Sequence, residues 1–143
     1  MKSIFLSLII IATTFHALAQ DVQPDKIPTV VKNTFVTKYP KAVSPKWTHA
    51  NRIYNAEFKI GLSDHQATID SLGNLLKHQY EITFRSLPKA VNDNLNANYP
   101  EAKIENVEQV DVGRTASYIV HLRDVTGLHH ISFNQEGKET AKK

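Results

Sequence analysis

The sequence predicts an α+β fold, a tandem repeat of one helix plus an antiparallel four-stranded sheet, with the helices packed on one face of the sheet. Three observations predict it. Many positions recur at a fixed spacing, apolar residues at helical spacing open each copy, and apolar and polar residues alternate after them. The chain is therefore one supersecondary unit written twice, with repeats at about residues 27–85 and 87–143.

The repeat rests on nine residue pairs that are separated by 60 positions. Beyond them the separation grows to 64, as from Tyr54 to Tyr118 and from Gly73 to Gly137, so the second copy contains a four-residue insertion. The nine pairs are Ile27/Leu87, Pro28/Pro88, Val30/Ala90, Val31/Val91, Phe35/Leu95, Tyr39/Tyr99, Pro40/Pro100, Ala42/Ala102 and Trp47/Val107.

Residues 1–19 precede the first copy and have the pattern of a secretory signal peptide. Lys2 is followed by an apolar run, and residues 17–19 form a small-x-small cleavage pattern. A retained membrane anchor would need about 20 apolar residues, and polar residues from Thr13 onward interrupt the run. We expect cleavage after Ala19, which gives a periplasmic or secreted protein with no membrane attachment.

Residues 20–143 have the length of a single domain that can bury its own core. The chain contains no cysteine, so no disulfide can staple it. Without Lys2 it carries 16 basic and 14 acidic residues, and neither sign runs in blocks, which argues against nucleic acid as a partner. The polar ends, residues 20–26 and 138–143, are expected to be loose tails.

Each copy is predicted to begin with a helix. Apolar residues at steps of three, one, four and four form a stripe before Pro40, and the segment before Pro100 repeats it. Pro28 and Pro88 suit a first helical turn, where the missing N–H has no partner inside the helix. The prolines at the other end push the tyrosine before them out of helical geometry. Helices of about 12 residues are marginal alone and need a sheet to dock on.

The sheet is predicted from alternation with a period of two. Tyr54, Ala56 and Phe58 point to one side, while Asn55 and Glu57 point to the other. Leu76, Tyr80, Ile82 and Phe84 are expected to form the inner side of a half-buried strand, and both helix-end tyrosines to pack on the sheet with their hydroxyls in water. The predicted strands are residues 43–50, 53–60, 65–70 and 74–84, then 103–112, 116–123 and 128–134. For the C-terminal end, a strand at residues 138–142 is the alternative to a loose tail.

One predicted hairpin places two histidines side by side. If the turn at residues 124–127 pairs Val120 with Ile131 and Tyr118 with Phe133, His121 lies opposite His130 on the outer side, with Cβ atoms about 4.5–5.5 Å apart. The pair is a weak candidate for part of a Zn or Cu site that would need further ligands. A second hypothesis is that it makes this side sensitive to mild acid.

Several motifs together resemble the PepSY-like, beta-lactamase-inhibitor-like family of exported bacterial proteins. They are the two Tyr-Pro-x-Ala helix ends, Trp47, the Tyr-x-Ala-Glu-Phe strand at residues 54–58, and the Asp-x-x-Gly turn at residues 70–73. Val107 replaces the tryptophan in the second copy. The resemblance spans the mature chain and implies one curved, concave sheet backed by helices, with no known catalytic residues. By analogy of fold it also suggests inhibition of a hydrolase.

The sequence contains no motif for catalysis. It lacks a cysteine nucleophile, a G-x-S-x-G elbow, an H-E-x-x-H helix and a phosphate-cradling glycine loop. The carboxylates on strands and turns form no close pair in sequence, so no acid–base couple can be nominated. We predict that the protein is not an enzyme, has no catalytic residues and carries no cofactor.

The leading functional hypothesis is an exported binding module that meets a protein or peptide of the cell envelope through the polar side of the sheet. The alternative is a periplasmic small-ligand or metal-binding protein. Reversing the charge of Glu57 or Arg123 is expected to weaken a complex without unfolding the domain. The candidate binding residues are Asn55, Glu57, Lys59, Lys77, Gln79, Glu81, Ile119, His121, Arg123 and His130.

Overall fold

The computed structural model describes residues 20–142, and the predicted signal peptide lies outside them. No helix in the described part is long and apolar enough to cross a membrane. In chain order the elements are β1 (Gln20–Asp21), the 3-10 helix η1 (Pro24–Lys26), α1 (Thr29–Lys38), β2 (Val43–Ala50), β3 (Ile53–Ile60), β4 (Ser63–Asp70), β5 (Leu75–Glu81), the 3-10 helix η2 (Phe84–Ser86), α2 (Lys89–Asn98), β6 (Lys103–Val112), β7 (Thr115–Asp124), β8 (Gly127–Asn134) and β9 (Glu139–Lys142).

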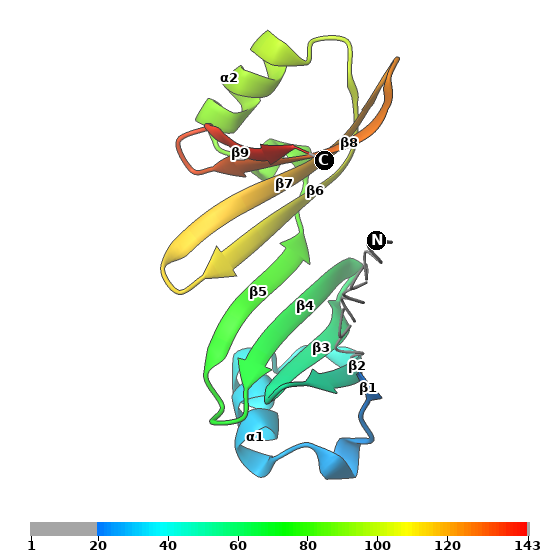
Figure 1. Ribbon diagram of the computed structural model, residues 1–143, viewed down its shortest axis with the longest axis vertical. Coiled ribbons are helices and arrows are strands. Elements are labelled where there is room, and N and C mark those ends of the chain that lie inside the picture. Colours follow the sequence, from blue (N-terminus) through cyan, green and yellow to red (C-terminus); the bar gives the residue numbers. More distant parts are fainter. Residues whose placement is uncertain (1–19, 143) are drawn as a thin grey trace, which may run out of the picture.

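All nine strands form one antiparallel sheet whose order in space follows the sequence, from β1 to β9 (Figure 1). The two halves join where β5 pairs with β6, from His78 opposite Asp111 to Glu81 opposite Glu108. The predicted four-stranded units are therefore not separate sheets. Without β6, strand β5 would expose a row of unpaired backbone groups at an edge, and the pairing of the two strands satisfies those groups.

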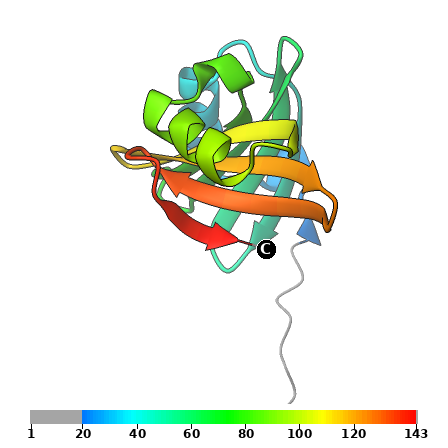
Figure 2. The ribbon, with the colours of Figure 1, turned by 90° about the horizontal axis from the view of Figure 1, so that it is seen from above.

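Helices α1 and α2 take equivalent places in the two halves. Each starts directly after its proline. Pro28 and Pro88 have extended backbones, with ψ of 142° and 145°, and are the last residues before the helices. The helices lie at opposite ends of the long axis (Figure 1), and seen from above α2 covers strands of its own half (Figure 2). Each helix packs on the core of its own half, so the two do not form one continuous layer over the sheet.

The two halves have separate hydrophobic cores, each between one helix and its own strands. Trp47 is 7% exposed and packs edge-on against Phe35, with ring centroids 5.0 Å apart, so this tryptophan is a core residue. Its second-copy counterpart Val107 is buried in the other core. The first core contains Ile27, Val31, Phe35, Tyr39, Trp47, Tyr54, Ala56, Phe58, Ala67 and Ile69, and the second Leu87, Val91, Leu95, Val107, Ala116, Tyr118, Val120, Leu122, Ile131 and Phe133.

A glycine turn touches each helix at the equivalent place. The hydroxyl of Thr34 in α1 donates a hydrogen bond of 2.8 Å to the carbonyl of Gly73. Sixty residues on, the Asn94 side chain in α2 donates one of 3.0 Å to the carbonyl of Gly137. Both glycines have positive φ, 86° and 76°, which few other residues tolerate. The repeat thus extends to a contact between turn and helix in both copies.

The strand predictions fail at the N-terminal end and in β5. The expected loose tails contribute β1, which no strand prediction covered, and β9, which agrees with the predicted strand at residues 138–142; they pair with β2 and β8. A register shift between β4 and β5 places Leu75 against the first core, whereas Leu76, predicted to point inward, is 39% exposed. Phe84 starts a 3-10 helix and is 42% exposed. A shift of one residue reverses the two sides of a strand, which explains the wrong assignment of Leu76.

Candidate functional site

The register of the sheet places all ten candidate binding residues on the side away from the two cores. Glu57 lies opposite Gln66, and Gln66 lies opposite Gln79, while the neighbouring Ala56 and Phe58 are buried on the core side. The same alternation holds in the second half. We call this side the polar face; its candidate residues are Asn55, Glu57, Lys59, Lys77, Gln79, Glu81, Ile119, His121, Arg123 and His130.

A hydrogen-bonded network crosses the junction of the halves on the polar face. Glu81 and Glu108 lie directly opposite each other on β5 and β6. The side-chain amide of Asn106 donates to Glu81 at 3.1 Å, and that of Gln79 donates to Glu108. Lys77 donates to the Gln79 oxygen at 3.3 Å. The network therefore joins strands that belong to different copies of the repeat.

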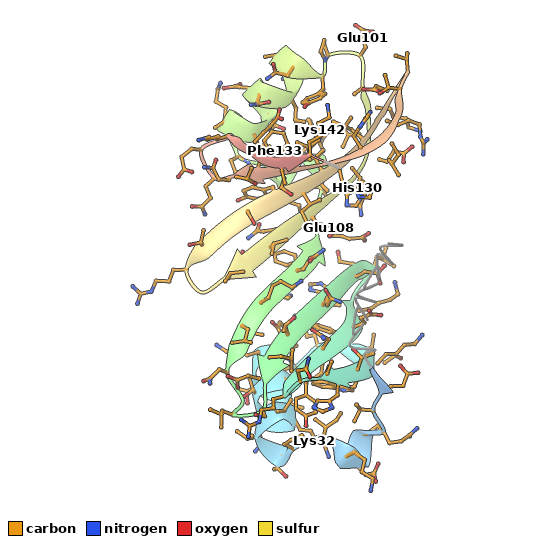
Figure 3. The ribbon with its side chains drawn as sticks, in the orientation of Figure 1. Lys32, Glu101, Glu108, His130, Phe133 and Lys142 are labelled. Carbon is orange, nitrogen blue, oxygen red and sulfur yellow. The ribbon has the colours of Figure 1, made fainter. Side chains whose placement is uncertain are left out.

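The predicted histidine pair is present, since His121 lies opposite His130 in the register with ring centroids 4.3 Å apart. The pairs Val120/Ile131 and Tyr118/Phe133 that predicted it are confirmed. His121 Nε2 lies 3.3 Å from Glu108 Oε1 but is buried and makes no hydrogen bond within the described residues. Figure 3 shows Glu108 and His130 near the middle of the long axis.

The histidine pair is not part of a larger ligand set. Within residues 20–142 no group of three or more histidine, aspartate or glutamate side chains is arranged to hold a metal ion. Metal binding by His121 and His130 stays a prediction, and a third ligand would have to come from elsewhere.

Arg123 sits at the exposed margin of the polar face in an ion pair. Its Nε lies 2.7 Å from Glu105 Oε1. The hydrogen bond from Arg123 lowers the pKa of Glu105 below its ordinary 4.5, and the pKa of Arg123 is raised for the same reason. Because the arginine side chain is 52% exposed, this pair contributes little to stability, and its charge is available to a partner.

A groove of about 440 Å³ opens on the polar face, mainly along the first half and reaching Glu108 in β6 of the second. Glu57, Glu81 and Glu108 line it, together with Gln66 and Gln79. Its remaining charged lining residues are Lys46, Lys59 and Asp64, of which the last two form an ion pair. Carboxylates therefore outnumber basic groups in the groove.

The core side of the junction carries a second cluster, which the sequence analysis did not identify. His65 Nδ1 and His78 Nε2 are 3.1 Å apart, and the His78 ring lies 4.6 Å from that of Tyr80. Burial lowers the pKa of both histidines below 6.5; the charge of Asp111, opposite His78, acts in the other direction on that histidine. The Tyr39 hydroxyl is buried there without a hydrogen-bond partner among the described residues.

Residues 14–77 and 70–139 match the protein family described as "Putative beta-lactamase-inhibitor-like, PepSY-like". The chain belongs to this family. The resemblance seen in the sequence is thereby confirmed, and the two matched segments agree with two copies of one unit. No curated protein matches the sequence of this PepSY-like protein.

Three solved Bacteroides structures share the fold of the PepSY-like protein. A "putative periplasmic" protein from Bacteroides eggerthii has a TM-score of 0.72 at 18% identity, covering 81% of this chain and 87% of its own. A DUF2874 family protein from Bacteroides uniformis has a TM-score of 0.70 at 21% identity, with coverage of 81% and 88%. A BLIP-like protein from Bacteroides fragilis has a TM-score of 0.68 at 18% identity, with coverage of 81% and 84%.

Glu108 and Asn106 are two polar-face residues of this PepSY-like protein, both in the hydrogen-bonded network, that sequence reasoning missed. Glu108 follows Val107, the buried counterpart of Trp47, so alternation alone would have placed Glu108 on the outer side. Asn106 follows a register shift in β6, and alternation does not predict its direction across such a shift.

Proposed function

We propose that this PepSY-like protein is an exported, non-enzymatic binding module whose polar face meets a protein or peptide of the cell envelope. The observation that carries the proposal is the register of the continuous sheet, which gathers the ten candidate residues on the side that no core covers. This side of the sheet is polar and partly charged, and both cores lie on the opposite side. Such a surface suits a partner that it recognises through charge and hydrogen bonds.

Export is supported by two observations. Residues 1–19 have the sequence pattern of a signal peptide, and the Bacteroides eggerthii protein of the same fold is described as periplasmic. The sharper form of the proposal, inhibition of a hydrolase, draws on the family description as beta-lactamase-inhibitor-like. Hydrolase inhibition and partner binding belong to the same proposal, because an inhibitor of this kind acts by binding and has no catalytic residues of its own.

The test is affinity capture from the native envelope and secreted fractions with the tagged chain. The variant replaces Glu57, His121 and Arg123 by alanine, and the control replaces the exposed helix residues Lys38, Asp93 and Asn96. We expect a specific partner that the control retains and the polar-face variant loses, with equal melting temperatures for both. A partner held equally by both variants would place binding away from the polar face.

Single charge changes refine the test. Glu57→Lys and Arg123→Glu are each expected to weaken the complex at least about tenfold, as loss of one charge-assisted contact does. Arg123→Gln is the better neutral comparison, because Arg123→Glu also sets a second carboxylate beside Glu105.

Capture of the partner repeated at pH 5 and pH 8 tests whether the His121/His130 pair makes binding sensitive to mild acid. Equal recovery of the partner at both pH values would exclude that role.

The groove favours a second candidate function, binding of a small ligand. A saturable compound that raises the melting temperature of the chain would support it. Calorimetric titration with Zn²⁺ tests metal binding by the chain directly, and the absence of saturable heat would exclude it.

A further inference from the structure

The groove on the polar face contains two glutamates that face each other at the junction of the halves. Glu81 and Glu108 are directly opposite in the β5–β6 register, and both side chains are half-buried. Like charges in this position destabilise a sheet unless something compensates them. The chain supplies two uncharged amide donors, from Asn106 to Glu81 and from Gln79 to Glu108, and the His121 ring nitrogen Nε2 lies 3.3 Å from Glu108 Oε1.

Within the described residues, the lysines and arginines of this region do not pair with either opposed glutamate. Lys59 pairs with Asp64, Lys46 lies opposite Glu57 in the register, and Arg123 pairs with Glu105. Within residues 20–142 no lysine or arginine nitrogen lies within 4.0 Å of either opposed carboxylate. Both carboxylates line the open groove, so a cation that enters the groove can reach them.

The carboxylate oxygens of Glu81 and Glu108 that are not fully used as acceptors suit a ligand group with several N–H donors. Glu81 Oε2 accepts no hydrogen bond within the described residues, and Glu108 Oε1 has only the His121 ring nitrogen at 3.3 Å. A guanidinium is planar and presents five N–H donors, so it can bridge two carboxylates, whereas an ammonium is a compact point charge.

We propose that the groove receives an arginine side chain of the partner, held between Glu81 and Glu108. The inference rests on the proposed function and makes it specific, because it names the chemistry that the polar face recognises. Charge complementarity carries it. A net acidic groove in a chain of formal net charge +3 is a local feature and does not follow from overall composition.

The test uses N-acetyl-arginine amide as the probe, with N-acetyl-citrulline amide as its neutral isostere and N-acetyl-lysine amide as the alternative cation. Nuclear magnetic resonance follows the side-chain amide signals of Gln79 and Asn106. We expect saturable shifts with the arginine compound, no saturation with citrulline, and weaker binding of lysine. Saturation by citrulline, or equal affinity for lysine, would overturn the arginine assignment.

The matched variants are Glu81→Gln/Glu108→Gln and the control Glu101→Gln/Glu136→Gln, whose residues are exposed outside the groove. The first is expected to weaken arginine binding at least tenfold and the control to leave it unchanged. If the double variant unfolds, the single variants Glu81→Gln and Glu108→Gln replace it in the test. Each is expected to weaken binding of the arginine probe at least threefold. Affinity within twofold of the parent chain in folded single variants would overturn the inference.

Failure of the arginine site and failure of the proposed function give different results. A captured partner that is lost with the Glu57, His121 and Arg123 variant but retained by Glu81→Gln/Glu108→Gln supports the polar face and overturns the arginine site. Saturable, glutamate-dependent binding of the arginine probe without any captured partner supports the site and counts against the proposed envelope partner.

Discussion

At the scale of single residues, the two helix-end tyrosines occupy equivalent positions with different surroundings. The Tyr99 hydroxyl donates to Glu139 Oε1 at 3.1 Å, and Lys142 Nζ lies 4.9 Å from the ring centroid. The Tyr39 hydroxyl is buried with no partner in the described part of the chain, and burial raises its pKa to about 12. The expectation that both hydroxyls reach water is therefore wrong for Tyr39.

This difference predicts opposite results for the same substitution. Tyr99→Phe removes a hydrogen bond to a carboxylate and should lower the free energy of unfolding by about 1 kcal/mol. Tyr39→Phe removes a buried hydroxyl that has no partner, so it should be neutral or stabilising. Urea denaturation of both variants measures the two changes. A loss at Tyr39 equal to that at Tyr99 would mean that the Tyr39 hydroxyl has a partner in solution.

The stacked histidines predict a loss of stability in mild acid. Burial holds the pKa of His65 and His78 below the ordinary 6.5, so the unfolded chain takes up protons before the folded chain does. Their contribution is complete above pH 6.5 and is lost as the pH falls through the folded pKa values, with a slope of at most about 1.4 kcal/mol per pH unit for each proton. Melting temperatures between pH 8 and pH 5 should therefore fall.

Matched variants assign this pH dependence to the half-buried pair of His65 and His78. His78→Gln should flatten the fall in melting temperature between pH 7 and pH 5, whereas His130→Gln, at an exposed position on the polar face, serves as the control. An unchanged slope in His78→Gln would show that other groups cause the acid effect.

At the scale of elements, the glycine turns fix the distance between each helix and its sheet. A Cβ added at Gly137 would lie 2.3 Å from the carbonyl oxygen of Ala90 in α2, and one at Gly73 would lie 2.6 Å from a Val30 methyl group. A Cβ at Gly113, which also has positive φ, would meet nothing within 4 Å. Backbone and side-chain space are therefore restricted at Gly137, whereas only the backbone is restricted at Gly113.

Gly137→Ala is expected to destabilise the chain by about 2–4 kcal/mol, since strained backbone and overpacking add. Gly113→Ala should cost about 1 kcal/mol, because it carries the conformational penalty alone. Urea denaturation compares the two variants. Equal losses would show that α2 moves away from the turn at little cost.

Local elements were predictable from the sequence where local rules decide them. The predicted bounds of β2, β3 and β6 equal the observed ones, period-two alternation identified β3, β7 and β8, and the prolines located both helices within a few residues. The polar-face side of His121 and His130 followed from the core pairs beside them.

Long-range pairing accounts for what the sequence did not predict. Strand β1 has a polar sequence and exists because β2 offers a backbone partner. The junction of β5 and β6 depends on two segments that are separated by α2, and no local pattern indicates it. The Glu81/Glu108 pair and the groove lie at this junction or beside it, so the most specific part of the candidate site was also the least predictable.

At the scale of the whole molecule, one sheet carries two cores. The core clusters share no residue, and the halves meet chiefly through the β5–β6 pairing. Backbone hydrogen bonds along four residue pairs couple the halves more weakly than a shared apolar core would. This arrangement should allow one half to open while the other stays folded.

Native-state hydrogen exchange tests this with one core variant in each half. Leu95→Ala removes the buried side chain that docks α2, at a cost of about 2–5 kcal/mol, and Phe35→Ala does the same for α1. Leu95→Ala should speed exchange of β7 and β8 amides by about 30-fold or more, as at least 2 kcal/mol implies, and leave β3 and β4 nearly unchanged. Phe35→Ala should give the reverse pattern. Equal acceleration in both halves by either variant would mean that the β5–β6 pairing makes the sheet a single cooperative unit, and a partner bound across the junction would then have no separate halves to hold together.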